Sequence, residues 1–202
     1  MRSFSEIETI SKRASRGAGF SWGVSEEIGK SVRLLEMFGL PGILYLKSYL
    51  EQISNHNFQK ITVVSAENIS NNIPYCPISV GVNFMDQIHN LEKIDKINFS
   101  NLAYPLLVVP FLSRSSEIIG KKLLLNLENF KFLFNYNQSI FSNFDNSLIT
   151  KTSKFFISFN QNEDSFDKMA WDTLYKISQK TFVDETESSK KTSAGAGLID
   201  ND

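Results

Sequence analysis

The sequence predicts an α+β fold: N-terminal helices, then a mixed or antiparallel sheet of about five strands, a late amphipathic helix and an extended C-terminal tail. Two observations support it: apolar residues recur at helical spacing with capping signals over the first fifty residues, and strand-like runs gather between residues 61 and 159. We expect one domain over residues 1–182, then a flexible spacer and glycine-rich acidic tail over 183–202.

Three helices are expected before the first strand. Overlapping Ser-x-x-Glu capping boxes open a helix that runs from about residue 4 to Gly17. A second helix spans about residues 24–38, capped by Ser21 or Ser25 and closed by Gly39. Pro41 opens a third, through about residue 53.

The rest of the chain alternates strand and helix signals. Residues 61–64 have the β-branched density of a strand, residues 68–74 are expected to form a loop, and Pro77 begins a helix. The uniformly apolar residues 102–109 are typical of a strand buried on both faces. Further strands are expected at 121–127, 130–136 and 154–159, before an amphipathic helix over 165–180.

Composition excludes several classes of function. The formal net charge of −1 favours neither nucleic acid nor an acidic membrane surface as partner. The longest apolar run, residues 102–112, is about half as long as a membrane helix requires. The single cysteine, Cys76, excludes an internal disulfide and a multi-cysteine zinc site. We therefore expect a soluble cytoplasmic protein; the sequence points to no cofactor, metal ligand set or oligomeric state.

Glycines gather at two places, residues 17–42 and the last eight residues. Near the N-terminus, Arg16, Gly17, Gly19, Ser21 and Trp22 precede a helix, so backbone N–H groups and a cation would meet there, as in anion-binding sites. The alternative is a tight helix–helix turn, with Gly17 as C-cap, Phe20 and Trp22 in the core and Arg16 in solvent. That alternative is the simpler explanation of the segment alone.

Charged residues follow on the next helix. Glu26 and Glu27 are candidate acid/base residues, and Lys30 and Arg33 lie along the same stripe as Glu26 as candidate ligand contacts. An exposed ion pair is the plainer interpretation. Gly29, in the middle of the helix, costs about 1 kcal/mol relative to alanine and indicates close approach by another backbone or a ligand.

The C-terminal segment contains Gly195, Gly197, Asp200, Asn201 and Asp202, together with two aliphatic residues. Its three negative charges, counting the terminal carboxylate, would suit docking onto the basic positions near Arg16. A frayed acidic terminus is the alternative.

The run from Arg16 to Gly23, continued by residues 26–33 and 39–42, resembles the opening of a bacterial family known as domain of unknown function 3726. The ending over residues 195–202 is similar to that of the family, and this likeness implies that the tail belongs to the family pattern. One departure is visible: family members tend to have Arg-Thr-Tyr-Val-Pro where this chain has Lys-Thr-Phe-Val-Asp at 180–184. The family brings no activity with it.

We therefore expect binding, with or without chemical transformation, of a small anionic metabolite at residues 16–23, with the tail as a lid. The competing hypothesis is a non-catalytic accessory subunit whose tail inserts into a partner enzyme. Cys76, His56, His89 and Asp86 are weaker candidates, and Cys76 is expected to be a buried structural residue.

Overall fold

The structure, a computed structural model, describes residues 2–54, 56–160 and 164–182. It separates into two compact units, Met1–Asn162 and Glu163–Asp202, which we treat individually. The predicted α+β class is confirmed. The boundary expected between residues 182 and 183 lies where the described residues end, so it stays a prediction.

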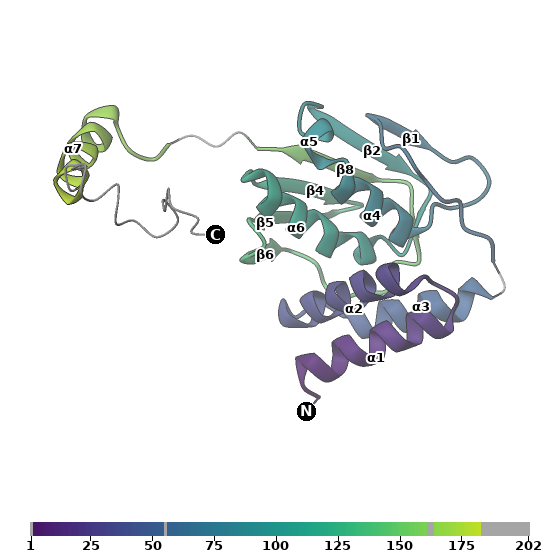
Figure 1. Cartoon of the computed structure of the whole chain (residues 1–202). Coiled ribbons are helices and arrows are strands. Elements are labelled where there is room, and N and C mark those ends of the chain that lie inside the picture. The colour runs from purple at the N-terminus through teal and green to yellow at the C-terminus, as the bar shows by residue number, and fades with distance from the viewer. Residues whose placement is uncertain (1, 55, 161–163, 183–202) are drawn as a thin grey trace, which may run out of the picture. The chain divides into compact units, whose positions relative to one another are not determined.

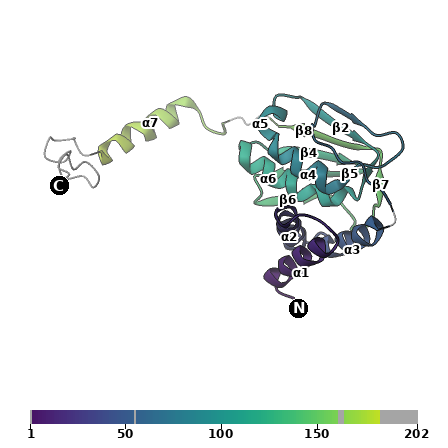
Figure 2. The same ribbon diagram turned by 45° about the vertical axis from the view of Figure 1, so that its right-hand side comes forward.

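Three helices open the first unit and pack together as one group (Figures 1 and 2). They are α1 (Phe4–Gly17), α2 (Trp22–Met37) and α3 (Gly42–Ile53). Capping signals act as expected: Ser3 Oγ accepts a hydrogen bond from the Glu6 amide at 3.2 Å, and Ser21 Oγ from the Val24 amide at 3.4 Å.

A six-stranded mixed sheet follows, with strand order β1-β2-β8-β4-β5-β6. Its strands are β1 (Glu67–Ile69), β2 (Lys96–Ser100), β4 (Leu123–Leu127), β5 (Phe130–Asn135), β6 (Ser139–Ser142) and β8 (Phe155–Phe159). Only the β1–β2 pair is parallel among the paired strands. A separate two-stranded ladder joins β3 (Leu102–Ala103) to β7 (Lys151–Thr152).

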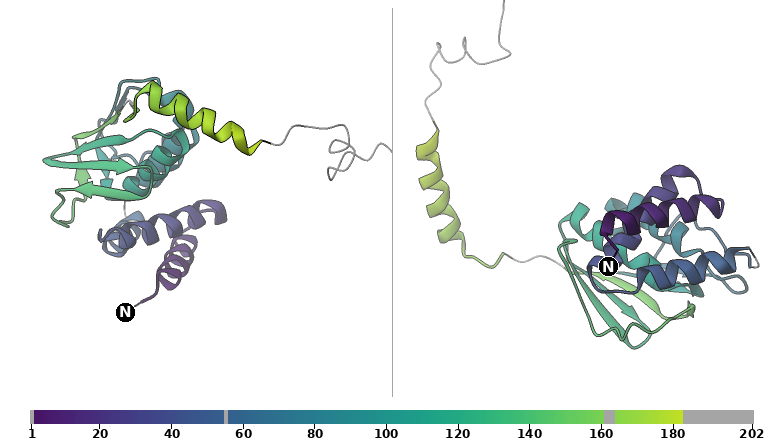
Figure 3. Two further views of the ribbon diagram at one scale, coloured as in Figure 1. Left: turned by 90° about the vertical axis from the view of Figure 1, so that its left-hand side faces the viewer. Right: turned by 90° about the horizontal axis from the view of Figure 1, so that it is seen from below.

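Helices cover one face of this sheet within the first unit (Figures 1 and 3). They include α4 (Pro77–Asp86), α5 (Ile88–Leu91), the 3-10 turn η1 (Pro105–Val108) and α6 (Val109–Ile119). Strand β4 shows the consequence, because Leu123, Leu125 and Leu127 are buried while Leu124 and Asn126 are exposed. The helices α2 and α3 contact α6 and η1 from the other side, so the core continues from the sheet into the helical group.

Two predicted strands are wrong. Residues 61–64 form no strand; the neighbouring strand is β1, whose last two residues fall in the stretch 68–74 expected to be loop. Residues 102–109 are buried as expected, but they form β3, η1 and the first residue of α6. Apolar density reports burial, and it does not distinguish a buried strand from a buried helix start. The strands β2, β6 and β7 and the helix α6 were not expected. The strands β4, β5 and β8 match the predictions at 121–127, 130–136 and 154–159.

The second unit contains α7 (Lys168–Ser178) and the short 3-10 turn η2 (Gln179–Thr181), where the late amphipathic helix was predicted. All of its described side chains are exposed, among them Met169, Trp171 and Leu174. The expected tail lies outside the described residues.

Candidate functional site

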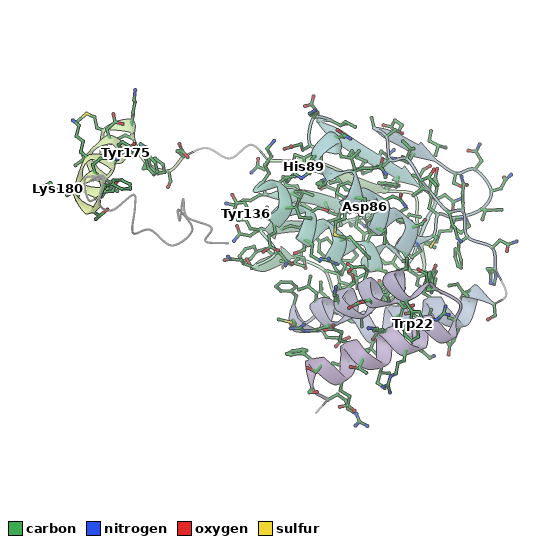
Figure 4. All side chains as sticks on the ribbon, viewed as in Figure 1. Trp22, Asp86, His89, Tyr136, Tyr175 and Lys180 are labelled. Carbon is green, nitrogen blue, oxygen red and sulfur yellow. The ribbon has the colours of Figure 1, made fainter. Side chains whose placement is uncertain are left out.

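The Arg16–Gly23 segment forms a tight turn between α1 and α2. The Phe20 amide donates to the Ser15 carbonyl at 3.2 Å and the Gly19 amide to the Arg16 carbonyl at 3.1 Å, which ends α1. Gly19, with φ of 98°, supplies the left-handed residue, so Gly17 is not the cap of the alternative interpretation. Trp22 is also not in the core, because 60% of it is exposed (Figure 4).

Two glycines of the turn have no structural cause within the described chain. A Cβ at Gly17 or Gly23 would meet no atom within 4 Å, and neither residue has a positive φ. Gly29 is the opposite case, since a Cβ there would lie 2.8 Å from the Glu8 carbonyl oxygen of α1. The expected close approach at Gly29 is therefore that of a neighbouring helix, whereas Gly17 and Gly23 leave open backbone beside the turn.

The side chain of Arg16 contacts residues of this turn. One guanidinium nitrogen donates to the Phe20 carbonyl at 2.8 Å, and the group lies 5.3 Å from the Trp22 ring centroid. These contacts hold Arg16 in place at the start of α2, where the first backbone N–H groups have no partner within the helix. The turn thus brings together a fixed cation, an exposed indole and unobstructed backbone.

Charged residues of α2 form ion pairs, some within the helix and some with neighbouring helices. Glu27 pairs with Lys30 at 3.0 Å and with Arg114 of α6, while Arg33 pairs with Glu8 at 3.0 Å. Glu26 Oε2 lies 3.9 Å from Lys12 Nζ. Lys30 therefore pairs with a carboxylate of its own helix, and Arg33 links α2 to α1. In the described structure neither residue contacts Arg16.

Partial burial by itself raises the pKa of Glu27, but hydrogen bonds and charge attraction from Arg114 and Lys30 outweigh it and hold the pKa below its ordinary value. Glu27 is accordingly ionised at neutral pH. That state suits an ion pair or a base and does not suit a general acid.

The tail residues Gly195, Gly197, Asp200, Asn201 and Asp202 lie outside the described residues. Among the described residues, no group of three or more His, Cys, Asp or Glu side chains is placed to hold a metal ion. No described helix has the length and apolar character needed to span a bilayer.

A hollow of about 600 Å³, which the sequence did not predict, opens where the end of α3, the β3–β7 ladder and the segments 56–58 and 72–74 meet. Its polar lining includes Gln52, His56, Asn57, Asn72 and Lys151, and its apolar lining includes Phe58 and Tyr104. Only folding brings these positions together, although the aromatic and carboxamide residues at 56–58 and 71–75 are visible in the sequence.

A chain of tilted and edge-to-face aromatic contacts connects the turn to the hollow. The Phe20 centroid lies 6.4 Å from that of Tyr49, which lies 5.2 Å from Phe58 and 5.5 Å from Tyr104. Buried Cys76 contacts the same cluster, with Sγ 3.0 Å from Tyr49 Oη, which fits its expected structural role. His89 and Asp86 are exposed on α5 and α4 and contribute to neither region (Figure 4).

No curated protein and no solved structure matches the chain. The resemblance of residues 195–202 to a family ending therefore stays a prediction. A family model described as protein of unknown function (DUF3726) matches residues 2–75, so the N-terminal part of this chain, including the Arg16–Gly23 turn, carries the pattern of that family.

Proposed function

We propose that this chain is a soluble cytoplasmic protein that binds a small anionic metabolite at the Arg16–Gly23 turn. The observation that carries the proposal is the pair of glycines, Gly17 and Gly23, which weaken helix ends without any packing or conformational need. A ligand lying against the backbone would explain both. Arg16 and the first N–H groups of α2 would hold its charged group, and Trp22 would cover its apolar part.

Binding is favoured over catalysis at this turn. Glu27, one of the two candidate acid/base residues, is committed to Arg114 and Lys30. Glu26 is exposed beside Lys12, and in the described structure its side chain makes no hydrogen bond or ion pair with the residues of the turn. An enzymatic version would need Glu26 as base, with Lys30 and Arg33 released from their present partners.

Tryptophan fluorescence tests the proposal directly, because Trp22 and Trp171 are the only tryptophans of the chain. In a full-length Trp171→Phe background, inorganic phosphate or succinate should change Trp22 fluorescence saturably. Arg16→Ala should weaken that binding about tenfold or more, which corresponds to roughly 1.4 kcal/mol. Arg13→Ala removes the same charge one turn earlier in α1 and is the matched control.

If Arg16→Ala and Arg13→Ala bind these anions equally, the turn is not an anion site. The proposed lid function of residues 195–202 is tested in the same assay with a chain ending at Ala194. Loss of affinity in the truncated chain would support a lid, and equal affinity would remove it.

The accessory-subunit hypothesis is favoured by one specific observation, the exposed apolar face of α7. Met169 is 79% exposed, Leu174 64% and Ile177 54%. An amphipathic helix with such a face is a common way to bind a groove on a partner protein. A partner that co-purifies from the native host with the full chain, and is lost when residues 200–202 are deleted, would support a tail that inserts into a partner enzyme.

A further inference from the structure

We infer that the hollow at the end of α3 is a second binding site, specific for an organic oxyanion with a flat apolar body, such as an aromatic carboxylate or aryl phosphate. The hollow measures about 600 Å³, within the range of small-ligand sites. The inference is independent of the proposed function at the turn.

The charge of the lining selects an anion. Lys151 and His56 line the hollow, and none of its lining residues is an aspartate or glutamate. Lys151 makes no ion pair with any described residue, a property that it shares with other lysines such as Lys131 and Lys154, but of these three only Lys151 lines the hollow. An anion entering the hollow would therefore meet a cation that the protein has not neutralised.

Three carboxamides add hydrogen-bonding capacity without charge. Gln52, Asn57 and Asn72 line the hollow, and their side chains form no hydrogen bond with the described part of the chain. Each amide offers N–H donors to an oxyanion. Together with Lys151 they would surround an anionic group with donors from separate segments of the chain.

The apolar wall favours a flat ligand body. The aromatic residues Phe58 and Tyr104 are among the lining residues of the hollow, beside Ile73 and Pro74. Tyr104 is a buried residue held at φ of 42°, a conformation that a bulky side chain rarely adopts. Its amide donates to the Thr150 carbonyl at 2.9 Å and its hydroxyl to the Ser48 carbonyl at 3.2 Å, so several contacts fix this strained conformation.

Short ladders hold the walls of the hollow rigidly. In the β3–β7 ladder Lys151 lies opposite Ala103, which sets the position of the cation beside Tyr104. On the other wall the Gln59 amide donates to the Pro74 carbonyl at 2.9 Å, and the Cys76 amide donates to the Gln59 carbonyl at 2.8 Å. The loops that carry Phe58 and Asn72 are thereby pinned, as expected of a preorganised site.

Titration of the full chain with phenyl phosphate and benzoate, followed by amide NMR shifts, tests the inference. At least one of the two should bind saturably at millimolar concentration or below, with shifts at residues 56–58, 72–74 and 150–151. Inorganic phosphate lacks the ring and benzyl alcohol lacks the charge, so both should bind more weakly. The relative affinities of phenyl phosphate and benzoate show which oxyanion is preferred.

Lys151→Gln should weaken the binding of the preferred probe about tenfold or more, because it removes a charge-assisted hydrogen bond. Lys154→Gln is the matched control, since it removes an exposed lysine nearby that does not line the hollow. Arg16→Ala should leave this binding unchanged, which separates the hollow from the turn.

Three results would each overturn the inference: no saturable binding of either aryl anion, shifts confined to residues 16–24, or equal affinity for Lys151→Gln and Lys154→Gln. The first and third results leave anion binding at the turn untested, whereas shifts confined to residues 16–24 would place the aryl anion at the turn instead of the hollow.

Discussion

Helix α2 contains two glycines, six residues apart, that have opposite explanations. Gly29 lies against α1, where the Glu8 carbonyl oxygen and the Lys12 Cβ leave no room for a side chain. Gly23, near the beginning of the same helix, is exposed and has open space around it. Packing against α1 explains the first glycine, whereas no contact within the described chain requires the second.

The same division applies to the charged and aromatic residues. Around the packed part of α2, Arg33 and Lys30 pair with glutamates of α1 and α2. At the beginning of the helix, Arg16 stacks on an indole that remains 60% exposed. An arginine and a tryptophan placed together at the surface are typical of binding residues rather than of a stabilising core. The packed part of α2 and its exposed beginning therefore differ in how their charged and aromatic residues are used.

The largest expected effect is that of Gly29→Ala, which should break the packed region. Its new Cβ would lie 2.8 Å from a backbone oxygen, so α1 and α2 must move apart. We expect a loss of about 1–3 kcal/mol, as for other overpacked cores. Thermal unfolding should show it as a melting temperature lower by several degrees, while Gly17→Ala, with open space, should show no such loss. Equal melting temperatures would disprove the close α1–α2 contact.

Glu27→Gln should have the next largest effect, about 1 kcal/mol at neutral pH, because it removes a partly buried partner of Arg114. The folded-state pKa of Glu27 is depressed, so its contribution is present above the ordinary value of 4.5 and is lost as the pH falls below it. The melting difference between wild type and variant should therefore shrink on acidification. Glu26→Gln is the control, and a difference that grew towards acid pH would contradict the assignment.

Gly23→Ala should produce a smaller change of opposite sign. Alanine fits the open space and favours helix, so stability should rise by about 0.5–1 kcal/mol. If a ligand approaches this backbone, anion binding should weaken in the same variant. Calorimetric unfolding together with anion titration measures both quantities. A variant that is more stable and binds equally well would leave Gly23 without a ligand-related explanation.

Trp22→Ala should have the smallest effect on stability, within about 0.5 kcal/mol, because most of the indole is exposed. Its effect on ligand affinity should be much larger, which is the signature of a binding residue. Phe20 provides the contrast, since its ring packs on Tyr49 and Phe20→Ala should lower the melting temperature. Chemical denaturation of both variants checks the comparison. Equal losses of stability would place Trp22 with the structural residues.

Local signals predicted the fold well where capping and periodicity agree. Ser3 and Ser21 act as caps, α1 ends at Gly17 as expected, and the strands β4, β5 and β8 lie within or beside their predicted ranges. The apolar run at 102–109 was misassigned because both a buried strand and a buried helix start are uniformly apolar. Strand β2 contains Lys96 and Asn98 at exposed or half-buried positions, which weakened its signal.

The candidate site was predicted only in part. The glycine-rich turn is visible because its residues are consecutive in the chain. The hollow is not, because Gln52, Asn72 and Lys151 lie in a helix, a loop and a strand that are far apart in sequence. Arg114 shows the same limit: its pairing with Glu27 joins residues 87 positions apart, so spacing along the chain could not indicate it.

The sequence by itself determined the α+β class, the helical opening, the family pattern over residues 2–75 and the position of the turn, because caps, periodicity and glycine placement are local properties. Only the tertiary structure decided which glycines are packed and which are free, and which cations are already paired. Those distinctions depend on contacts between distant segments, and such contacts exist only once the chain has folded.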